Sequence, residues 1–225
     1  MGINELGDIK IMAEETIIID NVEFSADRKT LLGCYTEKEE YTIPDGVTAI
    51  AEEAFESHER LKRIVIPGSV KIIGEDAFAG CMDLESVIIS EGVTEIREGA
   101  FSVCERLKSI VIPDSVQIIG PWAFSGCTSL ESAIMSNNVS QIGEYVFYDC
   151  PSLTTFAIPA NFTEIPEGFL AECVSLESVI IPDSVTKICR DAFWNCKKLS
   201  SIKIPAGVTE IEIEAFMGTP TQNKF

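Results

Sequence analysis

The chain has 225 residues, of which 46 % are hydrophobic, enough to form a substantial buried core. Seventeen basic and thirty-six acidic side chains leave a formal net charge of −19, which repels nucleic acid and anionic membrane surfaces. The single histidine, His58, excludes multi-histidine metal sites and most Ser-His or Cys-His catalysis. We therefore expect a non-enzymatic protein without a metal or cofactor.

The first forty residues are predicted to form an N-terminal segment and a β-hairpin cap. Acidic residues such as Glu5 and Asp8 stand where an export signal would be basic and then apolar, and every apolar run is too short to span a membrane. The extended stretches TIIIDNVEFS and TLLGCY flank the turn-forming residues 26–29. We expect these two stretches to pair and to close the open edge of a sheet.

A repeat of 23 residues occupies the rest of the chain. Leucine recurs at this step seven times, at Leu61, Leu84, Leu107, Leu130, Leu153, Leu176 and Leu199. Phenylalanine forms a second column from Phe55 to Phe216, in which Leu170 fills one place, and proline forms a third. We predict about eight units over residues 41–218, followed by a C-terminal tail at 219–225.

One unit predicts its own local structure. The segment from Leu61 to Pro67 alternates β-branched residues and ends at proline, which indicates a short strand followed by a tight turn. A second extended piece brings Ile73 back to the core, and the spacing of Phe78 and Cys81 favours one helical turn, so we expect short helical or irregular return segments. Because a single unit cannot bury its apolar side chains alone, neighbouring units must stack into a parallel-sheet solenoid.

The written-out repeat resembles that of the BspA-like leucine-rich repeat proteins, with passages such as LESVIIPDSVTKI following it closely. The resemblance implies a right-handed solenoid. Many members are bacterial surface or secreted proteins linked to adhesion or to binding host proteins. Because the chain shows no export signal, it is expected to be either a trimmed surface protein or a member that stays inside the cell.

The cysteines follow the repeat as well. Six of them are spaced 23 residues apart, at Cys81, Cys104, Cys127, Cys150, Cys173 and Cys196. Side chains stacked in this way run parallel to one another, so we expect buried free thiols in place of disulfides or a zinc site. Cys34 and Cys189 lie outside this column and are the better candidates for reactivity. His58 takes the place of cysteine in an early unit and is interpreted as a structural residue.

Two surfaces are candidate binding sites. The first, on the outer face of the strands, has apolar residues beside a column of hydroxyls, and its candidates are Val65, Ile88, Val111, Ile134, Ile180, Ser86, Ser109 and Ser132. The second is an aromatic group on the return side, made of Trp122, Tyr145, Tyr148 and Trp194. Strand propensity explains the first set equally well, and packing between turns explains the second.

These observations lead to two hypotheses of function. The first is a protein-interaction module that binds a protein of unknown identity, in the manner of a bacterial cell-surface adhesion protein. The alternative is an architectural spacer within a larger surface protein. Pairing of two copies through the strand face is a further open alternative.

Overall fold

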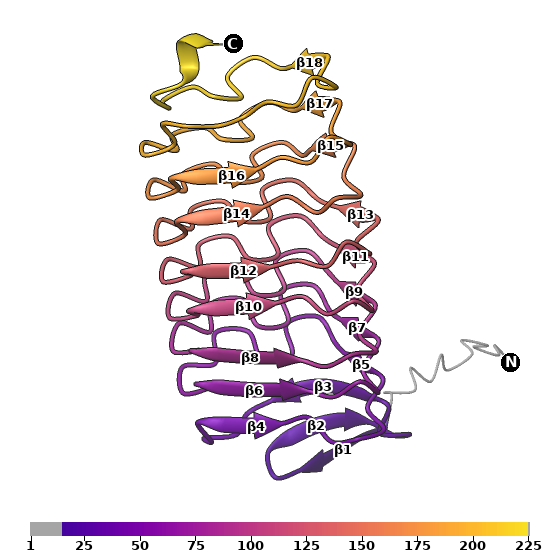
Figure 1. Cartoon of the computed structure of the whole chain (residues 1–225). Helices are drawn as coiled ribbons and strands as arrows, with labels where there is room; N and C mark the ends of the chain where they lie inside the picture. The colour runs from indigo at the N-terminus through magenta and orange to yellow at the C-terminus, as the bar shows by residue number, and fades with distance from the viewer. Residues whose placement is uncertain (1–14, 225) are drawn as a thin grey trace, which may run out of the picture.

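The computed structural model describes residues 15–224, so residues 1–14 of the predicted N-terminal segment lie outside the described part. The described chain is a single stack of coils with parallel strands, as Figure 1 shows. Each complete coil contributes one longer strand to a first ladder and one two-residue strand to a second ladder, and then returns through turns. The predicted repeat solenoid with a parallel β-sheet face is confirmed.

The strands fall into three groups. The N-terminal strands are β1 (Thr16–Ile19), β2 (Val22–Ser25) and β3 (Thr30–Cys34). The first ladder holds β4 (Glu40–Thr42), β6 (Arg63–Ile66), β8 (Ser86–Ile89), β10 (Ser109–Val111), β12 (Ser132–Ile134), β14 (Thr155–Ala157) and β16 (Ser178–Ile180). The second ladder holds β5 (Ala49–Ile50), β7 (Ile72–Ile73), β9 (Glu95–Ile96), β11 (Ile118–Ile119), β13 (Gln141–Ile142), β15 (Glu164–Ile165), β17 (Lys187–Ile188) and β18 (Glu210–Ile211).

The N-terminal cap has one strand more than the sequence predicted. The stretch TIIIDNVEFS is itself a hairpin, because Asp20 and Asn21 both take left-handed backbone angles, with φ of 52° and 62°. β2 then pairs antiparallel with β3, and β3 pairs parallel with β5 of the second ladder. The cap is therefore a three-stranded antiparallel meander joined to the end of the solenoid.

The return side, predicted from the sequence to be helical or irregular, consists of tight turns in place of the helical turn that the spacing of Phe78 and Cys81 favoured. Alternate backbone N–H groups donate to the next coil: Asp76 N to Glu98 O at 2.9 Å, and Phe78 N to Ala100 O at 2.8 Å. Ala77 N, between them in the sequence, closes a turn onto Gly74 O at 3.3 Å. A helix would use all of these groups within one segment, so lateral bonding between coils replaces helical bonding here. In the described residues, the only helix is the 3₁₀ turn Gln222–Lys224.

Two columns of left-handed residues set these turns. Both repeat every 23 residues: Glu53, Asp76, Gly99, Trp122, Tyr145, Gly168, Asp191 and Glu214 in the first column, and Ser57, Gly80, Val103, Gly126, Asp149, Glu172, Asn195 and Gly218 in the second. Glycine, asparagine and aspartate tolerate positive φ, whereas a β-branched or bulky side chain there is strained. The backbone angle is thus imposed by the stack even where the residue disfavours it.

The core consists of columns of identical side chains. The leucines of the repeat, including Leu84, Leu107 and Leu130, are fully buried. The rings of successive phenylalanines stack at centroid distances of 4.7 to 5.5 Å between Phe55 and Phe147. Each such ring pair adds about 0.5 to 1.5 kcal/mol beyond its burial.

The second ladder breaks at one place, between β13 and β15. At this position in other coils, a backbone N–H donates to the previous coil, as Gly143 N does to Ile119 O at 2.8 Å and Cys189 N does to Ile165 O at 3.0 Å. Pro166 occupies the equivalent position and has no N–H to donate to Ile142 O. Phe162 also stands where the neighbouring units have valine. A crevice of about 460 Å³ opens here.

Pro166→Gly should close this break, because the residue regains the N–H that Gly143 uses one coil earlier. A new hydrogen bond raises the free energy of unfolding by about 0.5 to 1.5 kcal/mol. Loss of the proline ring, which restricts the unfolded chain, lowers it by about 0.4 to 1 kcal/mol. The free energy of unfolding should therefore change little. Hydrogen exchange at the amides of Thr163 and Glu164 should slow at least tenfold (about 1.4 kcal/mol). If exchange at these amides stays fast, the larger Phe162 side chain is what keeps the coils apart. Adding Phe162→Val to Pro166→Gly should then slow the exchange.

Val103→Asn should raise the free energy of unfolding by about 1 kcal/mol, because asparagine tolerates the left-handed angle that strains valine. Val103 has a φ of 56° and an exposed side chain. Asp149→Val places valine at the equivalent position of another coil, where φ is 53°. This matched variant should lower stability by a similar amount in thermal or denaturant unfolding. Equal stability of all three proteins would show that the strain is relieved elsewhere.

Candidate functional site

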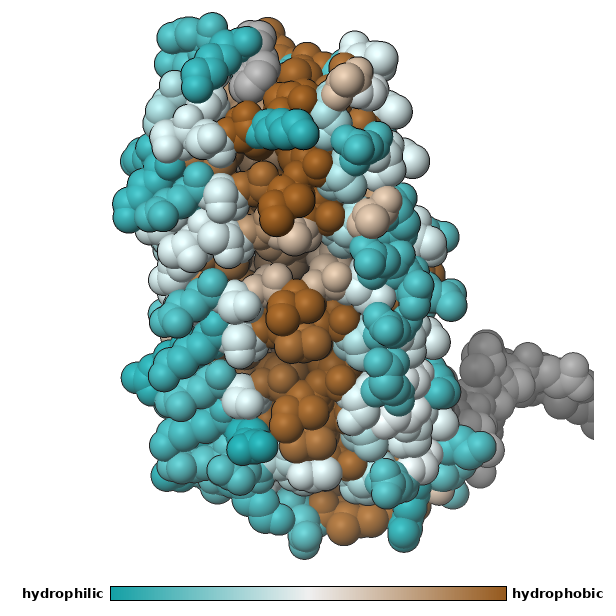
Figure 2. All heavy atoms as spheres, viewed as in Figure 1, coloured by the Kyte–Doolittle hydropathy of each residue, from teal (hydrophilic) through white to brown (hydrophobic). Residues whose placement is uncertain are grey.

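The outer face of the first ladder, called the strand face below, has a row of exposed apolar side chains. The residues on either side of this row point inward, and they are fully buried at Ile64 and Ile66 but only partly buried at Ala133 and Met135. Four residues of the row are exposed by 41, 56, 59 and 69 %, namely Ile88, Val111, Ile134 and Ile180. Val65 belongs to the same row and is half-buried. Figure 2 shows the resulting hydrophobic band, bordered by hydrophilic side chains.

The strand register places the candidates of this face side by side. Val65 pairs with Ile88 in β6 and β8, and Val111 pairs with Ile134 in β10 and β12. Ile180 lies beyond Ala157, its partner in the β14–β16 pair. The hydroxyl column runs alongside, since Ser109 pairs with Ser132, both exposed, and Ser86 is half-buried in β8. The structure therefore brings the predicted strand-face residues into one continuous surface.

Three of the four predicted return-side aromatics also come together. The rings of Trp122 and Tyr145 stack at a centroid distance of 4.3 Å with 4° between their planes. Tyr148 meets both edge-on, at 5.6 Å from Trp122 and 5.9 Å from Tyr145. Trp194 lies apart from this group and is half-buried. Trp122 and Tyr145 both have left-handed backbones, with φ of 57° and 56°, so two bulky residues are held in a strained conformation.

A polar network adjoins Tyr145 that the sequence did not reveal. The Tyr145 hydroxyl donates to Glu167 Oε1 at 2.8 Å, and Arg190 Nε donates to the same oxygen at 3.1 Å. The Arg190 and Tyr145 hydrogen bonds lower the pKa of Glu167, whereas burial, followed by the Glu167 hydrogen bond, raises the pKa of Tyr145 to about 12. The only sequence signal for this network is the 23-residue step from Glu167 to Arg190.

The cysteine column is a set of buried thiols that each bond to backbone. All eight cysteines are free. Each column thiol lies near a backbone carbonyl of the previous coil, as Cys81 Sγ does to Phe55 O at 3.0 Å and Cys127 Sγ does to Phe101 O at 3.3 Å. Burial raises the pKa of Cys127 to about 12, so this thiol is not activated as a nucleophile.

The two cysteines outside the column are not activated either. Cys34 is buried, and burial raises its pKa. Burial, followed by the charge of Glu164, raises the pKa of Cys189 to about 11. The hypothesis that either is reactive therefore has no support from its surroundings.

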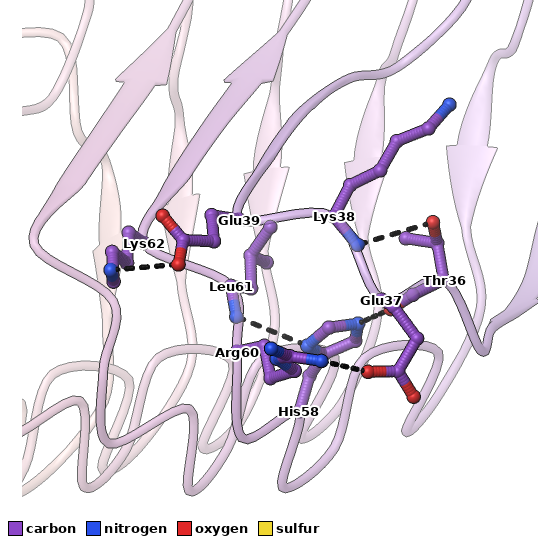
Figure 3. Close-up of polar contacts among 8 residues, drawn as sticks. All are labelled: Thr36, Glu37, Lys38, Glu39, His58, Arg60, Leu61 and Lys62. Carbon is purple, nitrogen blue, oxygen red and sulfur yellow. Dashed lines mark hydrogen bonds and ion pairs between the residues drawn. The ribbon is translucent and has the colours of Figure 1, made fainter.

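His58 holds two chain segments together, as Figure 3 shows. Its Nε2 lies 2.7 Å from Thr36 O, and its Nδ1 accepts from Leu61 N at 3.2 Å. These contacts correspond to a neutral imidazole with the proton on Nε2. Arg60 pairs with Glu37 at 2.5 Å beside it, so the cluster ties the cap to the first coil. With both ring nitrogens engaged, the ring has no free nitrogen to serve as a base or a ligand.

In the described part of the chain, no three His, Cys, Asp or Glu side chains are grouped closely enough to hold a metal ion.

Among residues 15–224, no helix has the length and apolar character that crossing a membrane requires.

The fold is similar to that of several bacterial proteins. A leucine-rich repeat protein of T. pallidum (TpLRR) is 31 % identical with a TM-score of 0.68, over 74 % of this chain and 80 % of that one. A leucine-rich repeat protein from Eubacterium ventriosum is 26 % identical with a TM-score of 0.61, over 92 % of this chain, which spans about half (50 %) of that protein. The pneumococcal vaccine antigen PcpA shares the fold alone, at 22 % identity and a TM-score of 0.58. The match covers 88 % of this chain and 47 % of the PcpA chain.

No curated protein matches the sequence. The family comparison is more direct, because six copies of the BspA type leucine rich repeat region match residues 28–115 and 95–223. These matches cover nearly the whole stack of coils, including the columns of leucine, phenylalanine and cysteine. The chain therefore belongs to the BspA-type leucine-rich repeat family.

Proposed function

We propose that this chain is a non-enzymatic protein-interaction module that binds a partner protein through its strand face. The observation that carries the proposal is the row of exposed apolar side chains on consecutive coils, from Ile88 to Ile180. Apolar surface gathered in one band on a monomeric protein marks a contact surface, whereas isolated exposed apolar residues do not. Adhesion at a bacterial cell surface is the setting that family membership favours.

The chemistry of the strand face suits a protein more than other ligands. The row supplies apolar area, and the hydroxyls of Ser109 and Ser132 border it with groups that both donate and accept hydrogen bonds. The backbone of the face is held by ladder pairing within β6–β8, β10–β12 and β14–β16, so little ordering is required on binding. The net charge of −19 disfavours nucleic acid and anionic lipid.

Replacing Ile88, Val111 and Ile134 by serine should weaken partner binding about 100-fold, because each loses about 1 kcal/mol of apolar contact. All three side chains are exposed, so thermal stability should stay nearly the same. The partner is first captured by a photo-crosslinking amino acid placed at Val111, and at Gln117 as an off-face control. Affinity of the purified partner is then measured for the wild-type and triple-variant chains.

Ile213→Ser is the matched control, because it removes an exposed apolar side chain outside the strand face. Its affinity for the partner should equal that of the wild type. Sedimentation of the chain alone identifies the case in which the partner is a second copy. If crosslinks at Val111 are no more frequent than at Gln117, and the triple variant binds as before, the strand face is not the binding site and the spacer hypothesis is favoured.

A further inference from the structure

The stacked pair Trp122–Tyr145 sits between two glycines of the same column, Gly99 and Gly168. Side chains in this column lean toward the following coil. A Cβ added at Gly168 would collide with the Tyr145 ring, and one added at Gly99 would collide with the Asp76 carboxylate. Since Trp122 likewise leans onto Tyr145, its other ring face is turned toward Gly99, which has no side chain of its own and carries only the short Asp76 carboxylate against its backbone. Trp122 is 38 % exposed.

On the Tyr145 side of the stacked pair, the guanidinium of Arg190 lies close to the ring hydroxyl. Glu167 precedes Gly168, and Arg190, one coil further along, pairs with the Glu167 carboxylate. The Tyr145 hydroxyl binds the same carboxylate. The Glu167 carboxylate, next to a glycine of this column, thus binds an arginine guanidinium and a tyrosine hydroxyl together.

On the Trp122 side, the same Glu-Gly step occurs without an arginine on the next coil. Glu98 precedes Gly99, as Glu167 precedes Gly168, but the position equivalent to Arg190 is Pro121. Within residues 15–224, neither Glu98 nor Asp76 has an ion-pair partner. The charge of Glu52, followed by burial and the charge of Glu98, raises the pKa of the nearby Glu75. A cation bound here would relieve this repulsion.

We propose that the uncovered face of Trp122, with Glu98 and Asp76 beside it, binds an arginine side chain of a partner protein. A guanidinium is planar and weakly hydrated, so it can stack on the indole while its N–H groups donate to a carboxylate. The internal Glu167–Arg190 pair shows that this column accommodates a guanidinium at a Glu-Gly step. The site lies on the return side, so it is independent of the strand face and of the function proposed for it.

The probe is a capped peptide, acetyl-Gly-Arg-Gly-amide, titrated into the Trp194→Phe variant of the full chain, in which Trp122 is the only tryptophan. Fluorescence of Trp122 and the NMR shift of its indole N–H should change saturably. The lysine peptide should bind less tightly, and the citrulline peptide, which keeps the shape but lacks the charge, should leave both signals unchanged.

Two variants should weaken binding of the arginine peptide about fivefold or more. Glu98→Gln removes the carboxylate with a minimal change of shape. Pro121→Arg places a guanidinium of the chain itself one coil beyond Glu98, as Arg190 is beyond Glu167, and should fill the site. Glu131→Gln, which makes the same change of charge next to the first ladder, should bind the peptide as the wild type does.

The outcomes separate a site from a general acidic surface. Equal responses to the arginine and citrulline peptides would overturn the proposal. So would an unshifted indole signal when the peptide binds, or equal weakening by Glu98→Gln and Glu131→Gln. Because Glu98 is exposed, its glutamine variant should fold even if Pro121→Arg does not, and far-ultraviolet circular dichroism verifies the fold of each protein. Binding to Ile134→Ser should be unchanged.

Discussion

Lateral backbone hydrogen bonding between coils is the interaction on which the structure depends. It joins the strands of both ladders, and it also joins the turns of the return side, where Phe78 N donates to Ala100 O. Coils therefore pair along both ladders and along the return side, except at the steps from β8 to β10, β12 to β14 and β13 to β15. A fixed length of 23 residues per coil keeps these bonds in register. The columns of leucine, phenylalanine and cysteine follow from that length, because equivalent positions must lie over one another.

Because lateral hydrogen bonding fixes the backbone of each coil, a residue that departs from the repeat changes a specific bond or backbone angle. Pro166 removes one donor, and the second ladder opens at that rung. Trp122 and Tyr145 enter a column of left-handed backbone that suits glycine and aspartate. A stack that imposes its backbone on every coil can hold such residues in a strained conformation, since the neighbouring coils stabilise it. Strained aromatic side chains at the surface are then candidates for binding.

The sequence predicted those parts of the fold that come from periodicity. Leu84, Leu107 and Leu130 form one buried column on successive coils, because their spacing equals the length of a coil. For the return side the sequence left helical and irregular segments open, because apolar steps of three suit a helix as well as a chain of turns. The structure has turns, and lateral bonds that local spacing does not contain make that choice. The site was predicted in part: alternation located the strand face, but neither Trp194's separation nor the Glu167–Arg190 pair has a local signal.

Electrostatic range explains why the two proposed surfaces act separately on so acidic a chain. At physiological salt the Debye length is about 8 Å, whereas neighbouring strands lie about 4.8 Å apart. A carboxylate such as Glu75 therefore interacts mainly with those on the coils next to it, Glu52 and Glu98. The net charge of −19 disfavours anionic partners, but it does not select a position. The position of binding depends on the groups beside the charge, which are the exposed Trp122 indole on the return side and the uncharged apolar row on the strands.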